Sequence, residues 1–226
     1  VTVRKRIVVR ARPHCDYSVS PASGLARSTF NEKPEKPAVP ELSWGENEID
    51  AFVYDSMREM GLKPNLEADR ATLARRLALD LTGLPPEPEM VDRFVNDASE
   101  NAYESIIEEL LNSSAYGEHQ ARYWLDAVRY GDTHGLHLDN RRGIYPYRDL
   151  VVGALNDNLP FDQFITWQLA GDLLPNPTLE QRVATGVVRM NRCSAEGGAI
   201  KADFQAKNYF DRTETLGTVL LGMTLT

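Results

Sequence analysis

Apolar residues recur at intervals of three and four along most of the chain after residue 46, and this spacing is what a fold built from α-helices requires. Ile49, Phe52, Val53, Met57 and Met60 show it clearly, on one face of a helix expected over 47–60. The sequence has no clean alternation over four to eight residues and no Asn-Gly or Asp-Gly turn. It therefore predicts an all-α fold, an irregular bundle of about eight or nine helices with a long polar loop.

Prolines, glycines and capping residues mark where these helices begin and end. Thr178 and Gln181 stand three residues apart before one apolar run, and Asn101 and Glu104 do so before another. This spacing is typical of a capping box, in which each side chain bonds the backbone N–H of the other residue. Helices are expected over 47–60, 66–82, 87–96, 118–130 and 203–221, and others begin at Asn101, Pro146, Pro160 and Thr178.

The first 44 residues lack helical spacing and contain five of the 13 prolines, which interrupt helices. We expect a disordered or extended Pro-rich arm over 1–44, whose last residues, Leu42 and Trp44, dock on the body. The helical domain then covers 45–226.

The net charge of −8 is unevenly distributed. Residues 1–12 hold five of the 25 basic side chains and no acidic one, so the remaining residues hold 20 basic against 33 acidic side chains. An acidic body repels phosphate backbones, and no nucleic-acid partner is expected. No apolar run approaches the roughly 20 residues that span a bilayer, so no transmembrane segment is expected. No signal peptide is visible, because only Ile7, Val8 and Val9 are apolar after the basic cluster.

A polar loop over 131–145, between two helical runs, holds the densest set of versatile side chains. Its segment DTHGLHLD contains Asp132, His134, His137 and Asp139. Imidazole nitrogen and carboxylate oxygen bind zinc or iron, so these four residues are candidate metal ligands. The alternative is that the histidines hydrogen-bond to backbone or carboxylate groups, as loop histidines more often do.

Aromatic, amide and charged side chains around the same loop form a second candidate site, for an anion or a sugar. Tyrosine and tryptophan faces stack on rings, while arginine and carboxylate groups bind hydroxyls or carboxylates. The alternative is a set of ion pairs, with Arg129 near Asp126, that ties the loop to its flanking helices. The candidate ligand-binding residues are Trp124, Arg129, Asn140, Tyr145, Tyr147, Arg148 and Glu196.

Several familiar motifs are missing, among them GxxxxGKS/T, GxSxG, HExxH and Cys-x-x-Cys-His. Nucleotide binding, serine-hydrolase chemistry and a haem bonded within this chain are therefore unsupported. Cys15 and Cys193 form no Cys-x-x-Cys pair and are expected to be free thiols, the second one half-buried. A disulfide between them is the alternative if the chain is exported.

A family resemblance rests on four segments, ADRATLARRLALDLTGLPPEPEMVDRF, YGEHQARYWLDAVRYGDTHGLHLDN, YPYRDLVVGALNDNLPFDQFITWQLAGDLLPNPTLEQRVATG and EGG. In this order they resemble a domain of unknown function from exported planctomycete proteins that also carry cytochrome c-like domains. The resemblance covers residues 30–226. Residues 30–44 look like the linker from a cytochrome module.

The resemblance implies an extracytoplasmic (periplasmic) location and, as partner, a cytochrome c-like domain of the same protein. It also implies that the helical domain is truncated, because the family continues past the position of Thr226 into a Cys-x-x-Cys-His segment. No cofactor is expected within this chain, and haem c or a metal would belong to that continuation or to a neighbouring domain. The expected function is redox or oxidative chemistry on an extracellular substrate. The alternative is a non-catalytic module that binds polysaccharide or positions its neighbours, so whether the chain is an enzyme stays open.

Overall fold

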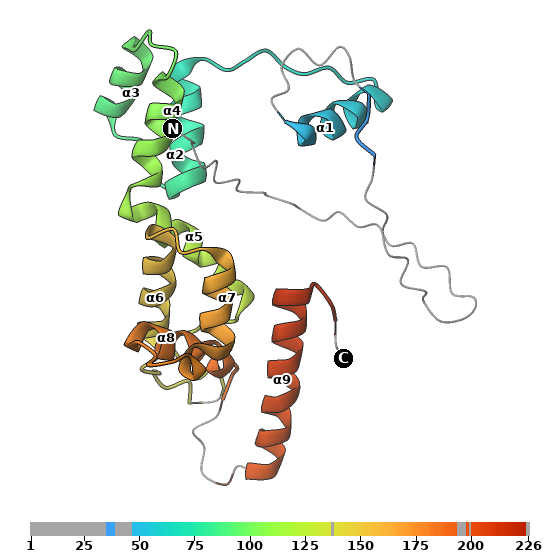
Figure 1. Ribbon diagram of the computed structural model, residues 1–226, viewed down its shortest axis with the longest axis vertical. Helices are drawn as coiled ribbons and strands as arrows, with labels where there is room; N and C mark the ends of the chain where they lie inside the picture. Colours follow the sequence, from blue (N-terminus) through green and yellow to red (C-terminus); the bar gives the residue numbers. More distant parts are fainter. Residues whose placement is uncertain (1–34, 39–46, 137, 194–197, 199, 225–226) are drawn as a thin grey trace, which may run out of the picture. The chain divides into compact units, whose positions relative to one another are not determined.

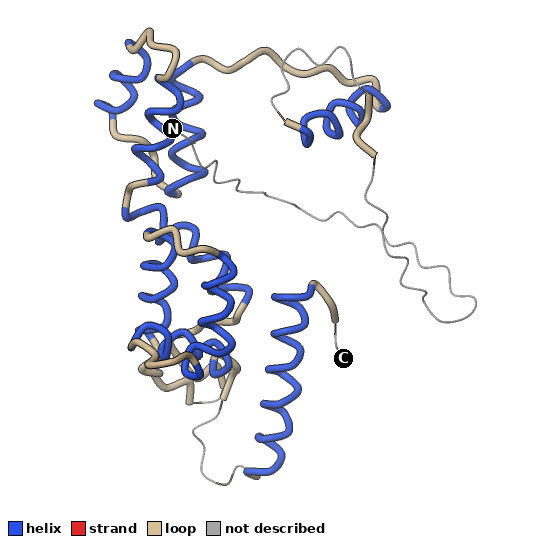
Figure 2. The backbone as a smooth tube through the Cα atoms, viewed as in Figure 1, coloured by secondary structure: helices blue, strands red, loops and turns tan. Residues whose placement is uncertain are grey.

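The computed structural model describes residues 35–38, 47–136, 138–193, 198 and 200–224. Within these residues the chain forms nine α-helices, two short 3-10 helices and no strand (Figure 1 and Figure 2). Isolated β-bridges join Thr133 to Arg141 and Gly135 to Cys193. The predicted all-α irregular bundle is therefore confirmed.

Backbone contacts divide the chain into one unit over 1–66 and another over 67–226, and each is described by itself. The first unit contains α1 (Glu48–Glu59), which helical spacing predicted. Asn47 caps this helix by accepting the Ile49 N–H at 2.9 Å, and Asp50 bonds back to the Asn47 N–H at 3.1 Å. The predicted arm lies outside the described residues except at 35–38, so the arm and its boundary stay predictions.

The second unit begins with three helices, α2 (Arg70–Thr82), α3 (Pro88–Asn96) and α4 (Ala102–Leu111), that share one apolar core. Small side chains allow close packing at this core, since Ala74 and Ala78 on α2 are almost completely buried. The larger side chains of the core include Leu81, Phe94, Ile106, Leu110 and Tyr116.

The two predicted capping boxes have different outcomes. The box at Thr178 and Gln181 is confirmed, because each side chain bonds the backbone N–H of the other residue. The box at Asn101 and Glu104 is wrong, because the Asn101 side chain makes no cap hydrogen bond and its φ of −97° and ψ of 11° are not extended. Helix α2 begins four residues later than predicted and α5 four residues earlier, because polar side chains just before each helix supply the caps.

The remaining helices of the second unit pack around a second apolar core, to which Ala121, Val128, Tyr147, Val151 and Phe164 contribute. Helices α5 and α6 lie side by side, as Figure 1 shows. The elements are α5 (Ser114–Ala127), α6 (Tyr145–Asn156), α7 (Phe161–Ala170), η1 (Gly171–Leu173), α8 (Leu179–Ala184) and η2 (Thr185–Arg189).

Helix α9 (Lys201–Leu221) is the longest element of the described chain and matches the helix predicted over 203–221. Arg129, just beyond α5, pairs with Asp211 and Glu214 on α9, the latter at 3.3 Å. Val219 packs on the second core, whereas Phe210 is 75% exposed. None of the described helices combines the length and apolar character that crossing a membrane requires.

The contact between α5 and α6 gives a prediction about two glycines. An added Cβ at Gly117 would lie 2.4 Å from Asn156 Oδ1 and 2.6 Å from the Val152 carbonyl oxygen, whereas one at Gly153 meets no atom within 4 Å. Gly117→Ala should lower the free energy of unfolding by about 1–3 kcal/mol through overpacking. Gly153→Ala should raise it by about 0.5–1 kcal/mol through helix propensity. Urea unfolding of both variants checks this, and equal effects would contradict the close approach.

Candidate functional site

The predicted polar loop is folded back on itself by backbone hydrogen bonds. The Arg142 N–H donates to the Asp132 carbonyl at 2.7 Å, and the His134 N–H donates to the Asn140 carbonyl at 3.0 Å. The bridge between Thr133 and Arg141 belongs to the same pairing. The loop is therefore a short, paired excursion between α5 and α6 and not a free linker.

A second set of bonds ties this loop to the segment that follows η2. The Cys193 N–H donates to the His134 carbonyl at 3.0 Å, and Gly135 forms a parallel bridge with Cys193. The Arg142 guanidinium donates to the carbonyls of Asn191, at 3.0 Å, and of Arg189. Backbone and side-chain hydrogen bonds thus join two segments that lie about 50 residues apart in the sequence.

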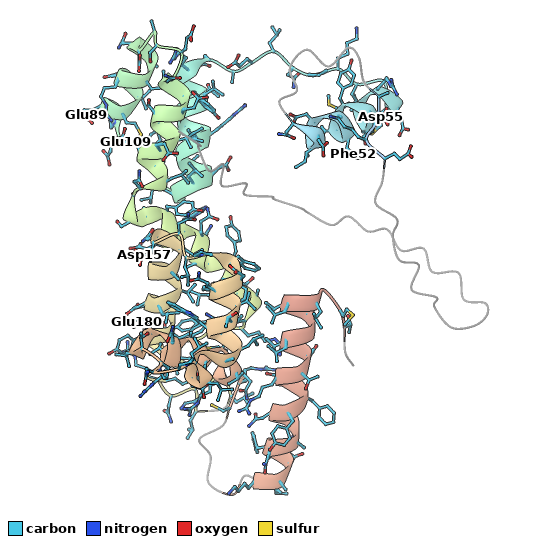
Figure 3. All side chains as sticks on the ribbon, in the orientation of Figure 1. Phe52, Asp55, Glu89, Glu109, Asp157 and Glu180 are labelled. Carbon is cyan, nitrogen blue, oxygen red and sulfur yellow. The ribbon has the colours of Figure 1, made fainter. Side chains whose placement is uncertain are left out.

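A cavity of about 980 Å³ lies between the loop, the ends of α6 and α7, α8 and η2. Its volume falls at the upper end of the range of small-molecule sites, roughly 300–1,000 Å³. Figure 3 draws the side chains of these helices and labels Glu180 on α8. The charged groups on the wall are the arginines Arg141, Arg142, Arg182 and Arg189 and the carboxylate of Asp172, besides the imidazole of His134.

A buried hydrogen-bond relay ends at the wall of this cavity. Trp124 Nε1 donates to the Tyr147 hydroxyl at 2.9 Å, and that hydroxyl donates to Gln168 Oε1 at 2.7 Å. Burial raises the pKa of Tyr147, so the hydroxyl keeps its proton and stays a donor. Gln168, only 1% exposed, also lines the cavity, and its buried Nε2 amide group has no hydrogen-bond partner among the described residues.

The orientation of the Gln168 amide follows from this relay. The Tyr147 hydroxyl already accepts the Trp124 N–H, so its own proton needs an acceptor, which Oε1 supplies. The reverse orientation would place an amide N–H₂ group against that hydroxyl proton. The unpartnered end of the amide is therefore a buried donor.

A thiol and an imidazole meet at the same cavity. Cys193 Sγ lies 2.8 Å from His134 Nδ1, and both residues line the wall. Cys193 is a free thiol of intermediate burial, as predicted for this residue.

The described members of the predicted metal site have separate partners. Asp132 accepts the Tyr130 hydroxyl at 2.6 Å, Asp139 accepts the Gly135 N–H at 2.7 Å, and His134 faces Cys193. Hydrogen bonds from Thr133 and Gly135 lower the pKa of Asp139. The part of the chain that the structure describes holds no group of three or more His, Cys, Asp and Glu side chains able to bind a metal. His137 lies outside the described residues, so the four-residue ligand set stays a prediction.

The predicted ligand-binding residues are only partly brought together. Trp124 and Tyr147 share a hydrogen bond, and Tyr147 lines the cavity. Arg129 pairs with α9 and not with Asp126, and Arg148 pairs with its neighbour Asp149 at 2.8 Å.

Asn140 and Tyr145 are exposed and do not line the cavity. Glu196 lies outside the described residues. The seven-residue set as a whole stays a prediction.

Several residues of the cavity wall were not predicted from the sequence. Arg182 and Arg189 lie on short elements, and nothing in their local pattern distinguishes them from surface arginines. Gln168 carries a readable signal, because it continues the apolar stripe of Phe161, Phe164 and Ile165 at helical spacing. A polar residue on a buried stripe indicates either a structural hydrogen bond or a ligand contact.

The structure is an all-α domain with a cavity lined by basic and apolar side chains. The chain belongs to the family described as PSCyt2, a protein of unknown function (DUF1549), whose sequence profile matches residues 48–226. This match confirms the domain of unknown function predicted from the four segments, while the planctomycete source, export and the cytochrome c-like partner stay predictions. No curated protein and no solved structure matches the chain.

The relay predicts a stability cost at one tyrosine and none at its neighbour. Tyr147→Phe removes the hydroxyl and leaves the Trp124 N–H and Gln168 Oε1 without their partner, which should lower the free energy of unfolding by about 1–3 kcal/mol. Tyr145→Phe removes an exposed hydroxyl and should change it by less than about 0.5 kcal/mol. Guanidinium unfolding of the two variants measures the difference. Similar changes in the free energy of unfolding would show that the relay does not stabilise the fold.

The pKa of Tyr130 predicts how the stability of the fold depends on pH in the alkaline range. Burial and the hydrogen bond to Asp132 raise the pKa of Tyr130 to about 12 in the folded chain, above the 10.0 of a free tyrosine. The unfolded chain therefore loses this proton first, and the contribution to stability is full below pH 10.0 and declines towards pH 12. Tyr130→Phe should consequently lose stability less steeply than wild type above pH 10.0. Urea unfolding at a series of pH values measures the stability of both proteins. Equal slopes of stability against pH would contradict the raised pKa of Tyr130.

Proposed function

We propose that this domain binds a small organic carboxylate in the cavity between the polar loop, α7, α8 and η2. The observation that carries the proposal is the set of four arginines in the cavity wall, beside Gln168, whose buried Nε2 donor has no partner among the described residues. A buried donor without a partner costs about 1–3 kcal/mol, and a ligand oxygen that reached it would recover that cost. A carboxylate matches this wall because guanidinium groups bind it with two parallel hydrogen bonds.

Charge supports an anionic ligand. The chain as a whole carries −8, yet four arginines face one aspartate at the cavity wall. Such a local excess of positive charge attracts anions and repels cations, and salt weakens both effects. The arginine side chains at positions 141, 182 and 189 form no ion pair with any carboxylate that the structure describes.

The apolar part of the wall supports a ligand with an organic body. Ile144, Pro146, Val183 and Met190 line the cavity beside the charged groups. A purely inorganic anion would leave this surface uncovered, whereas a ring or a short carbon chain would bury it at roughly 25 cal/mol per Å². The favoured ligand is therefore amphipathic, with a carboxylate at one end.

The wider role that we propose follows the family resemblance. The carboxylate would be a substrate of an exported protein whose cytochrome c-like domain takes part in redox or oxidative chemistry. Covalent attachment of haem needs a Cys-x-x-Cys-His segment, and the two cysteines at 15 and 193 do not provide one. The residues of this chain therefore do not fit haem c, and the redox group would belong to another part of the protein.

One observation favours the carbohydrate alternative. A separate pocket of about 330 Å³ is lined by aromatic side chains, among them Tyr123 and Phe161, which are 47% and 70% exposed. Exposed aromatic faces of this kind stack on sugar rings. A neutral hexose would bind there without help from the arginines.

Isothermal titration calorimetry with benzoate and its uncharged counterpart benzamide tests the carboxylate proposal. Benzoate should bind at least about tenfold more tightly, because only its carboxylate pairs with the arginines. Arg182→Gln should weaken benzoate binding about 10- to 100-fold, the cost of one hydrogen bond to a charged group.

The matched control is Arg75→Gln, which removes the same charge from an exposed position on α2 and should leave benzoate affinity unchanged. Thermal unfolding of both variants guards against a loss of structure. Equal affinity for benzoate and benzamide, or no binding of either, would refute the carboxylate proposal. Binding of neutral glucose that Tyr123→Ala abolishes would support the carbohydrate alternative in its place.

A further inference from the structure

The thiol of Cys193 is held in a fixed position at the cavity wall. Its backbone N–H donates to the His134 carbonyl at 3.0 Å, and the parallel bridge with Gly135 continues this pairing. The His134 N–H in turn donates to the Asn140 carbonyl at 3.0 Å. These backbone bonds therefore hold Cys193 next to His134.

The pair of side chains has the composition of an activated thiol. Cys193 Sγ lies 2.8 Å from His134 Nδ1, close enough for a hydrogen bond, and the cysteine is neither in a disulfide nor fully buried. A thiolate is the nucleophilic form of cysteine, and an adjacent imidazole is the usual group that carries the proton away.

The cavity also affects which reagents reach the thiol, independently of the imidazole. Gln168, buried to 99% of its surface and unpartnered at Nε2, lines the same cavity as Cys193, as do the four arginines. A carboxylate held by the arginines would lie in the cavity that Cys193 also lines. An anionic reagent should thus be concentrated at the thiol, while an uncharged one should not.

We propose that Cys193 is a thiol–disulfide exchange site for carboxylate-bearing disulfides, an inference that rests on the carboxylate-binding function proposed above. The Cys193 sulfur attacks one sulfur of the bound disulfide, a new Sγ–S bond forms, and the S–S bond of the reagent breaks. The departing sulfur leaves as a thiol with the proton that Cys193 loses, and His134 Nδ1 is within reach to carry it. The disulfide is the oxidant, and one of its two sulfurs is released in reduced form.

Exchange is favoured over acyl transfer because it demands less of the site. Acyl transfer needs hydrogen-bond donors placed around a developing oxyanion next to the sulfur. Among the described side chains, the hydrogen-bond partner of Sγ is the His134 ring. Thiol–disulfide exchange needs only a nucleophilic sulfur and an accessible reagent.

The test uses the full chain with Cys15→Ser, so that Cys193 is the single thiol. Second-order rate constants are measured by absorbance with two disulfides, the dicarboxylate dithiobis(nitrobenzoate) and the uncharged dithiodipyridine. The ratio of the two constants is then divided by the same ratio for N-acetylcysteine, a small free thiol without a binding site. This normalised ratio should exceed one by about tenfold or more.

Variants show whether the arginines produce this selectivity. Arg141→Gln, at the bridge beside His134, should lower the normalised ratio severalfold, because it removes one of the charges that attract the anionic disulfide. Arg75→Gln, the matched control on α2, should leave both constants as they were. A normalised ratio of one in the Cys15→Ser chain, or equal effects of the two arginine variants, would overturn the inference.

Calorimetry with benzoate on Cys193→Ser keeps the two proposals distinguishable, because this variant lacks the sulfur but keeps the arginines. If Cys193→Ser binds benzoate but the Cys15→Ser chain has a normalised ratio of one, exchange at Cys193 is rejected and the carboxylate site is retained. Loss of selectivity together with absence of benzoate binding would reject both.

Discussion

The hydroxyl of Tyr147 is the group on which the arrangement around the cavity depends. It stands on α6, accepts a hydrogen bond from Trp124 on α5 and donates one to Gln168 on α7. Because Tyr147 is only 2% exposed, water cannot replace either bond, and each of the three helices must hold its own partner in place. The same two bonds fix the orientation of the Gln168 amide. One buried network therefore positions three helices beside the cavity that Tyr147 and Gln168 line.

Arginines of this domain fall into two groups according to whether their charge is already compensated. Arg129 and Arg148 are paired with carboxylates, the first on α9 and the second next to it in sequence. Arg142 is held by carbonyl oxygens at the end of η2, so it joins the loop to that segment while its charge still faces the cavity. The other arginines of the wall have no such partner among the described residues, and a ligand carboxylate gains most where no internal acid competes. The distribution places a local excess of basic side chains in an otherwise acidic chain.

Local sequence signals predicted the helices well, and long-range contacts determined what those signals could not. The spacing of Ile49, Phe52 and Val53 is a property of one segment, as is the capping box at Thr178, and both are found in the structure. Asn101 has the residue type of a cap, but its backbone is not extended, so the type alone misled. The predicted metal and ligand-binding residues lie in one loop and beside it, where proximity in sequence is visible, with Glu196 as the distant exception. The cavity instead combines that loop with residues about 50 positions later through the Cys193 and His134 backbones, a pairing that no periodicity encodes.

Helix α5 connects the cavity to a core that does not line it. Tyr116, near its start, belongs to the core of α2, α3 and α4, while Ala121 and the following Val128 belong to the core beneath the cavity. A continuous helix is stiff because backbone hydrogen bonds join each turn to the next, so the position of one end determines the position of the other. Trp124, one turn from Ala121, is the first donor of the relay that ends at Gln168. The packing of α2, α3 and α4 around Tyr116 thus sets where α5 begins, and through α5 it sets the geometry of a wall to which none of those three helices contributes a residue.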